Sequence, residues 1–145
     1  MRRLLPIPVG LCLAVVLAAP AYSDADTDTC FKESGDAAIA GCTRAIQSGR
    51  FNNSTLAILF NNRAIEYRQA GDYDRAIADY TQTIRLDPDF TGAYSGRGLA
   101  YEGKGDTAKA LADYRKALTV APKHNDGQWA HDTARERLKA LAGPK

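Results

Sequence analysis

Apolar residues recur three or four positions apart along most of the chain, with polar residues between them. In the clearest segment, Gly71 to Pro88, the apolar side chains fall on one face of a helix: Ala76, Ile77, Tyr80 and Ile84. Asp72 precedes this face in the position of an N-cap, and Pro88 prevents the helix from continuing. The pattern therefore predicts an amphipathic helix between Asp72 and Pro88.

This segment occurs twice. Residues 71–88 (GDYDRAIADYTQTIRLDP) align with residues 105–122 (GDTAKALADYRKALTVAP) at a constant offset of 34 residues, and seven of the 18 aligned positions are identical. A fixed period of this length is typical of stacked repeats, because each unit is too small to bury its apolar face alone. Another helical pattern precedes each copy, so the repeating unit is a helix pair. We therefore predict an all-α fold, a short right-handed α-solenoid of antiparallel helix pairs.

The period divides the chain into five parts. We expect a signal peptide at 1–21, a flexible lead-in at 22–29, a degenerate first hairpin at 30–52, two full units at 53–124, and a capping helix with a tail at 125–145. The last helix has one apolar side, formed by Trp129, Ala130, Ala134, Leu138 and Leu141. Such a helix covers the exposed end of a solenoid.

The first 21 residues carry the pattern of an export signal. Arg2 and Arg3 precede an 11-residue apolar run from Val9 to Ala19, and small residues follow the run. This order is typical of a secretory signal peptide, with cleavage after Ala21 or Ser23. The run is shorter than the roughly 20 residues of a membrane-spanning helix, so we expect no membrane anchor after cleavage. The predicted location is the periplasm or the extracellular space.

Charge argues against a nucleic-acid partner. With 45% hydrophobic and 25% charged residues, the chain has the composition of a globular domain. Residues 1–21 hold two of the 19 basic residues and none of the 17 acidic ones, so the remaining chain has 17 of each. A neutral chain without a basic run lacks the electrostatic attraction that nucleic-acid binding needs.

Two of the three cysteines remain after cleavage, Cys30 and Cys42. In an oxidising compartment they are expected to form a disulfide. They lie six residues on either side of Asp36, so they would meet across a helical hairpin whose turn is Gly35-Asp36. The alternative is a pair of reduced, buried thiols. Their spacing is not a zinc pattern.

Aromatic residues, an alanine and a proline recur at equivalent positions in both full units. The first unit has Phe60, Tyr67, Ala76, Tyr80 and Pro88, and the second has Tyr94, Tyr101, Ala110, Tyr114 and Pro122. At these positions residues 57–122 resemble tetratricopeptide repeats (TPR), and residues 30–48 resemble the second half of a degenerate first repeat. The Cys…Cys hairpin followed by Asn-Asn-Arg is similar to small exported bacterial TPR proteins.

Two charged positions depart from this family. Arg63 and Arg97 stand where the TPR pattern has leucine, and we expect their stems to pack while their guanidinium groups reach water. The spacing of four residues also predicts weak, exposed ion pairs, Arg75 with Asp79 and Lys109 with Asp113.

The resemblance implies that the first helices of the pairs line a concave groove for an extended peptide or a partner helix. The matching positions are Ile58, Asn61, Asn62, Ile65, Arg68 and Gln69 in one unit, and Ser95, Leu99 and Glu102 in the next. Adjacent amides suit main-chain recognition, since each offers a donor and an acceptor; alternatively, Asn61 and Asn62 are exposed amides or bond between repeats. Relatives that clamp a C-terminal carboxylate use lysines, and no lysine occupies these positions.

We therefore predict a scaffold that binds a partner protein or peptide. The alternative from another class is a structural subunit that forms a homodimer through its end faces, with Trp129 at the contact. Catalysis has little support, because only His124 and His131 are available and no nucleophile has an evident base. A metal site at His124, Asp126, His131 and Asp132 lacks a recognisable ligand spacing. We expect no enzymatic activity, no cofactor and no metal.

Overall fold

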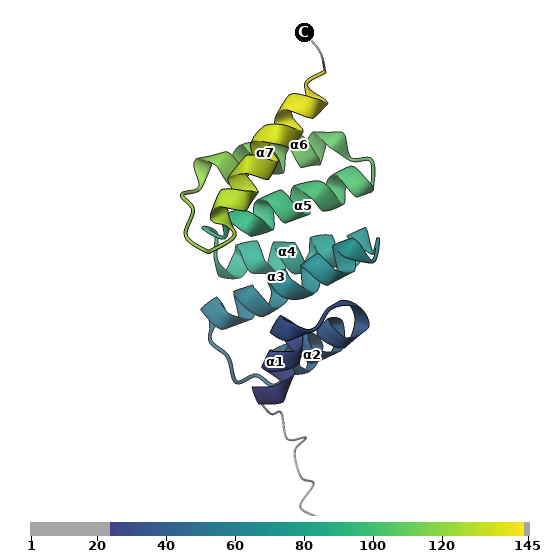
Figure 1. Cartoon of the computed structure of the whole chain (residues 1–145). Helices are drawn as coiled ribbons and strands as arrows, with labels where there is room; N and C mark the ends of the chain where they lie inside the picture. The colour runs from purple at the N-terminus through teal and green to yellow at the C-terminus, as the bar shows by residue number, and fades with distance from the viewer. Residues whose placement is uncertain (1–23, 144–145) are drawn as a thin grey trace, which may run out of the picture.

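The computed structural model describes residues 24–143, and within that range the chain is helical and contains no strand. The seven helices of this range are α1 (Asp24–Lys32), α2 (Gly35–Gln47), α3 (Asn53–Gln69), α4 (Tyr73–Leu86), α5 (Thr91–Gly103), α6 (Thr107–Thr119) and α7 (Gly127–Leu141). Helices α1–α2, α3–α4 and α5–α6 form pairs that stack one on the next, and α7 follows at the C-terminal end (Figure 1). This confirms the predicted all-α solenoid. The predicted signal peptide, 1–21, lies outside the described residues.

Helix α1 corrects one expectation. The segment expected as a flexible lead-in, 22–29, is helical from Asp24 onward. Its contacts with α2 explain why: Asp26 is buried and accepts a 2.6 Å hydrogen bond from Arg44 Nε, and Thr29 packs directly on Gly41. The segment has no apolar periodicity, so its sequence gave no sign of a helix that depends on tertiary contacts.

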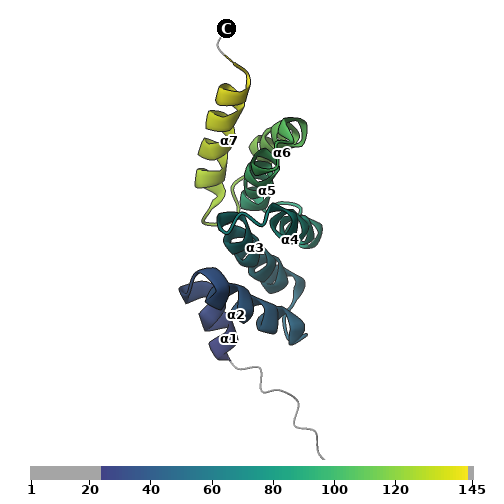
Figure 2. The same ribbon diagram turned by 90° about the vertical axis from the view of Figure 1, so that its right-hand side faces the viewer.

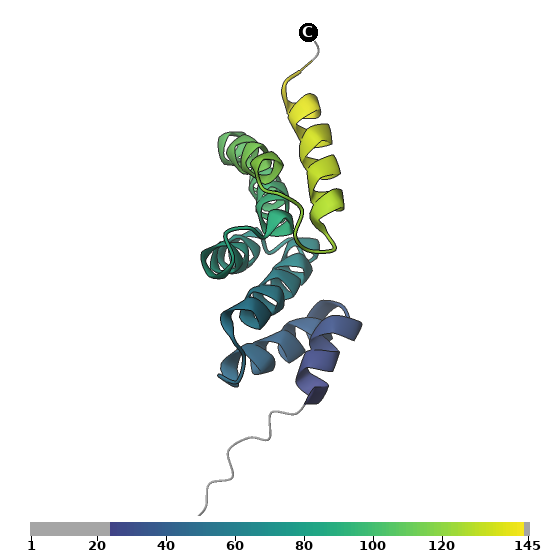
Figure 3. The ribbon, with the colours of Figure 1, turned by 90° about the vertical axis from the view of Figure 1, so that its left-hand side faces the viewer.

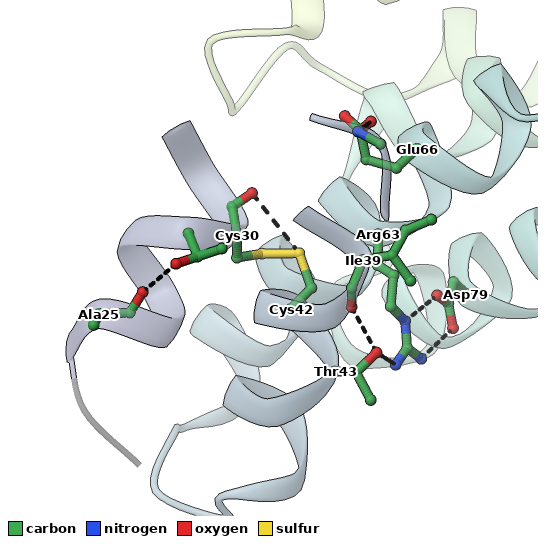
Figure 4. The surroundings of a disulfide bond; sticks show 10 residues. Ala25, Cys30, Ile39, Cys42, Thr43, Arg63, Glu66 and Asp79 are labelled. Atoms are coloured by element: carbon green, nitrogen blue, oxygen red, sulfur yellow. Dashed lines mark hydrogen bonds and ion pairs between the residues drawn. A yellow bond between two sulfur atoms is a disulfide. The ribbon is translucent and has the colours of Figure 1, made fainter. Parts of the chain in front are cut away.

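A disulfide joins Cys30 of α1 to Cys42 of α2 across the first hairpin (Figure 4). Both residues are buried beside Ala45 and Leu59, so the bond is part of the core between the first and second helix pairs. The predicted pairing is present, and the alternative of two reduced thiols is not.

The turn within each full unit follows from its sequence. Gly71 and Gly105 have φ values of 77° and 79°, a left-handed conformation that glycine adopts without strain. The next residue, Asp72 or Asp106, then accepts a hydrogen bond from the backbone N–H three residues further on. The repeated Gly-Asp pair thus ends one helix and caps the next.

Large aromatic side chains fill the space around α5, Tyr80 from the preceding unit and Tyr114 from the same unit. Tyr80 and Tyr114 are buried, and they pack on Gly96 and Gly98 of α5. A Cβ atom at Gly96 would lie 2.5 Å from Tyr80 Cζ, and one at Gly98 would lie 2.6 Å from Tyr114 Cε1. These glycines therefore allow α5 to approach both tyrosines closely.

Buried ion pairs join the two helices of each full unit, and here the expectations about charged positions were wrong. Arg63 Nε and Nη2 donate to the two carboxylate oxygens of Asp79 at 2.7 and 2.9 Å, and Nη1 donates to Thr43 Oγ1 at 2.9 Å (Figure 4). The guanidinium is therefore held mainly by protein groups and is not directed into water. It links α3 to α4 and to α2, the last helix of the preceding pair.

The second unit repeats this arrangement. Arg97 donates to both oxygens of Asp113 at 2.8 Å and to Thr81 Oγ1 at 3.0 Å. The residues expected to pair with the two aspartates bind elsewhere, Arg75 with Asp72 and Lys109 with Asp106. The aspartates face the neighbouring helix of their own pair, so a partner from that helix displaces the one four residues away.

Candidate functional site

Helix α3 forms the floor of a groove on the concave side of the stack. One cavity of about 440 Å³ lies between α3, Phe90 and the loop at 123–126 that leads into α7. A second cavity of about 310 Å³ lies further along α3, and both are lined by Asn61, Ile65 and Asp126. Because they share these residues, we treat them as one site, the α3 groove.

Besides α3, most of the lining of the groove comes from the C-terminal part of the chain, residues 123–129. Figures 2 and 3 show α1 and α7 on the same side of the stack, with α3 between them. All six positions predicted for the first unit line the two cavities: Ile58, Asn61, Asn62, Ile65, Arg68 and Gln69. The structure thus brings this half of the predicted site together.

The three positions predicted for the second unit are not in the groove, because α7 covers them. Ser95 is fully buried and donates a 2.7 Å hydrogen bond to the carbonyl oxygen of Ala130 in α7. Leu99 packs in the cluster that contains Leu138 and Leu141. The expectation that α7 merely covers the end of the solenoid was incomplete, since it also lies along the concave side of α5.

Glu102 has a structural partner as well. Arg137 Nε donates to Glu102 Oε1 at 2.9 Å, and Arg137 Nη2 and the Tyr114 hydroxyl donate to the same carboxylate. The hydrogen bond from Arg137, outweighing burial, lowers the pKa of Glu102, and the Tyr114 hydroxyl acts in the same direction. This network fixes the C-terminal part of α7 on α5 and α6.

The loop at 120–126 is fastened to the corner between α4 and α5. His124 stacks on Phe90 with ring centroids 4.1 Å apart, and its Nε2 lies 2.9 Å from Asp87 Oδ2. Lys123 also pairs with Asp87, at 3.3 Å. Burial tends to raise the pKa of Asp87, but the hydrogen bonds from His124, the Asp89 N–H and Lys123 lower it overall.

The histidines considered for catalysis or metal binding both make structural contacts. His131 Nε2 lies 2.9 Å from the carbonyl oxygen of Val120 and 3.1 Å from that of Ala117, at the end of α6. Asp132 is exposed and pairs with Arg135. Across residues 24–143, no group of three His, Cys, Asp or Glu side chains is placed to hold a metal ion.

Three polar atoms in the groove have no partner. Among the described residues, the buried side-chain atoms without a hydrogen bond are Asn61 Oδ1, Arg68 Nε and Asp126 Oδ1, and all three residues line the smaller cavity. A buried polar atom without a partner destabilises a fold by about 1 to 3 kcal/mol, so native proteins contain few of them. Their concentration at one cavity marks it as a place where a ligand can supply the missing bonds.

Sequence reasoning missed the contribution of the 120–126 loop. Phe90, Lys123 and Asp126 reach the groove only through contacts between residues more than 30 positions apart, which periodicity does not reveal. We had placed residues 125–126 at the start of the capping segment, 125–145, and gave them no role in the groove. The described helices include none with the length and apolar character needed to cross a membrane.

Comparison with known proteins agrees with the geometry. A family model described as tetratricopeptide repeat matches residues 61–125. No curated protein sequence matches the chain significantly. Among solved structures, the Arabidopsis OM64 TPR domain is 28% identical with a TM-score of 0.60, over 72% of this chain and 78% of that domain.

Two further structures are similar. The second TPR domain of the human RPAP3 protein, solved in complex with the HSP70 peptide SGPTIEEVD, is 26% identical with a TM-score of 0.65, over 85% of this chain and 93% of that one. MamA protein is 33% identical with a TM-score of 0.57, over 68% of this chain and 51% of MamA. With its 34-residue helix pairs, its stacked solenoid and these matches, the chain is a tetratricopeptide repeat protein.

Proposed function

We propose that this protein is an interaction scaffold that binds a partner protein or peptide in the α3 groove. The observation that carries the proposal is the group of three unpartnered polar atoms, on Asn61, Arg68 and Asp126, at one cavity of the concave face. The complex of the human RPAP3 domain with a peptide supports it, since that domain has the same fold.

The chemistry of the groove favours an extended peptide. Asn61 and Asn62 lie side by side on α3 and offer amide donors and acceptors, while Ile58 and Ile65 add apolar surface. Hydrogen bonds to the main chain of a peptide provide affinity, and pockets for its side chains provide selectivity. The α3 groove offers both hydrogen-bonding amides and apolar surface.

A peptide selection tests the proposal. Random 12-residue peptides displayed on phage are selected against residues 22–145, and the affinity of a synthetic selected peptide is measured by fluorescence anisotropy. The double variant Asn61→Ala/Asn62→Ala should weaken binding about tenfold or more, because two residues with hydrogen-bonding side chains are lost. The control is Arg85→Ala, an exposed residue on α4. Equal affinity for the double variant and the control would reject the groove as the binding site.

We also propose that the protein works outside the cytoplasm, as the 1–21 pattern predicts. The buried Cys30–Cys42 disulfide supports this location, since such bonds persist in oxidising compartments. Mass spectrometry of the protein isolated from a periplasmic fraction should find an N-terminus at Tyr22 or Asp24. An intact Met1 in all of this protein would contradict cleavage of a signal peptide, and absence of the protein from the periplasmic fraction would contradict export.

Self-association is the second candidate function. Trp129 and Phe31 are large apolar side chains with 47% and 48% of their surface exposed, a feature of surfaces that meet a partner. Light scattering over a concentration series shows whether the protein is a monomeric scaffold or associates with itself. A dimer that Trp129→Ala dissociates supports self-association, and a monomer at all concentrations excludes it.

A further inference from the structure

The smaller cavity of the α3 groove has an unusual set of polar groups. We call it the Asp126 pocket, and its lining residues are Asn61, Ile65, Arg68, Gln69, Tyr80, Gly92, Asp126 and Trp129. Asn61 is only 5% exposed, and its Oδ1 has no partner. The unpartnered atoms are two acceptors, Asn61 Oδ1 and Asp126 Oδ1, and one donor, Arg68 Nε.

The position of the Asp126 carboxylate is a second, independent observation. Asp126 is the N-cap residue of α7, yet its side chain does not cap that helix, although aspartate is a preferred capping residue. Instead the carboxylate lies against α5, where a Cβ atom on Gly92 would come within 1.6 Å of Asp126 Oδ2. Only a glycine at position 92 leaves room for it there.

The carboxylate shares the pocket with one cation, Arg68, but does not form an ion pair with it. No ion pair between described residues involves Asp126, and burial raises the pKa of its carboxyl group. A carboxylate held in such surroundings gains from a ligand that brings a positive charge and N–H donors. The exposed indole of Trp129 adds an aromatic surface that favours cations and apolar groups.

The full set of atoms discriminates between ligands. A lysine side chain offers donors only and leaves Arg68 Nε without an acceptor. A C-terminal carboxylate can accept from Arg68 Nε, but it offers no donor to Asn61 Oδ1 or Asp126 Oδ1 and is repelled by Asp126. A peptide bond within a chain offers one donor and one acceptor and leaves the charge of Asp126 unbalanced. A free N-terminus carries a cation with three N–H donors, followed at once by a carbonyl acceptor, so it matches all three groups.

We infer that the Asp126 pocket binds the free N-terminal amine of the partner polypeptide. The α-ammonium donates to Asp126 Oδ1 and Asn61 Oδ1, the first carbonyl accepts from Arg68 Nε, and the first side chain packs on Ile65 and Trp129. The inference rests on the proposed function, and it specifies which part of the partner enters the groove. Partners with a blocked N-terminus are excluded.

Short peptides of defined sequence test this inference. The amide Leu-Ala-Ala-NH₂ and its N-acetylated form are titrated separately into ¹⁵N-labelled residues 22–145, and NMR follows the side-chain amide of Asn61 and the indole of Trp129. We expect the free-amine peptide to shift both signals and to bind at least tenfold more tightly than the acetylated one. Asp126→Asn should remove this difference. Asp132→Asn, which changes an exposed acid on the same helix, should preserve it.

Three results would overturn the inference. They are equal binding of the acetylated peptide, tighter binding of the N-acetylated acid Ac-Ala-Ala-Leu-OH, and no shift of either signal at millimolar concentrations of Leu-Ala-Ala-NH₂. None of them rejects the α3 groove itself, because that proposal depends on how Asn61→Ala/Asn62→Ala affects the longer selected peptides.

Discussion

The buried pair of Arg63 and Asp79 makes a large and specific prediction about stability. Arg63→Met keeps an unbranched side chain of similar reach but removes the guanidinium. Asp79, whose side chain is only 8% exposed, then holds a carboxylate without its cation. Breaking a buried ion pair from one side costs about 3 to 5 kcal/mol, because the remaining charge stays desolvated. The Arg63 side chain is itself 15% exposed, so some water reaches the pair and we expect a loss of about 3 kcal/mol.

Two comparisons within the same chain calibrate this value. Arg97→Met breaks the equivalent pair with Asp113, with side chains 18% and 9% exposed, and should have the same effect. Arg75→Met breaks the pair with Asp72, with side chains 64% and 31% exposed, and should cost less than about 1 kcal/mol. The double variant Arg63→Met/Asp79→Leu should recover most of the loss, since no charge is then left buried.

Urea unfolding of residues 22–145, followed by circular dichroism with the disulfide intact, gives the free energy of unfolding for each variant. The slopes of the transitions must agree for the comparison to hold. If Arg63→Met loses no more stability than Arg75→Met, the buried pair does not stabilise the fold more than an exposed one. If the double variant is less stable than Arg63→Met, the desolvation argument is wrong.

Three further predictions follow from other parts of the molecule. The variant Cys30→Ser/Cys42→Ser should lower the free energy of unfolding by about 3 kcal/mol, as expected for a short cross-linked loop, and a urea titration with and without reductant measures it. Glu102→Gln should speed hydrogen exchange in α7, because the variant removes the charge that binds Arg137. Since the pKa of Glu102 is lowered in the fold, its stabilising contribution is present at neutral pH and is lost as acid protonates the carboxylate. Hydrogen exchange measured at several pH values tests both statements. At pH 7, Asp126→Asn should melt at the same temperature as the natural protein or above it, because the raised pKa of Asp126 makes its charged form unfavourable in the fold. The difference in melting temperature should shrink as the pH falls and Asp126 becomes protonated. A lower melting temperature of the variant at pH 7 would show that the charge stabilises the fold.

Much of the fold could be predicted from the sequence because the information is local and periodic. The spacing of three to four residues predicts the helices, and the 34-residue offset predicts the stacked pairs. The same regularity identifies α3 as a groove helix and thereby the six positions from Ile58 to Gln69. The Cys30–Cys42 pairing was predicted correctly, but the turn was not: α1 ends at Lys32 and α2 begins at Gly35, so the two cysteines are not equally distant from the turn.

The errors arose where polar side chains choose between partners. Arg63 and Asp79 recur 34 residues later as Arg97 and Asp113, so the sequence did contain a signal that the two positions belong together. The four-residue spacing from Arg75 predicts a partner for Asp79 on its own helix, but it does not take into account that the aspartate faces α3. The placement of α7 had no such signal, because Ser95 and Glu102 meet residues 35 positions away that lie outside the repeat.

The end of the repeat series and the polar wall of the groove have a common origin. Arg63 and Arg97 each bind a threonine on the last helix of the preceding pair, Thr43 and Thr81. One period further on, the positions of Arg97 and Thr81 hold His131 and Arg115. A histidine cannot reach as an arginine does, and an arginine offers no acceptor, so this contact cannot form again.

Helix α7 therefore cannot dock as the first helix of another unit by the same contacts. His131 bonds instead to the carbonyl oxygens at the end of α6, and α7 inclines toward α5, where Ser95 and Glu102 hold it. That inclination places the N-terminus of α7 beside α3 and Asp126 over Gly92. The residue changes that end the solenoid thus also supply the polar wall of its groove.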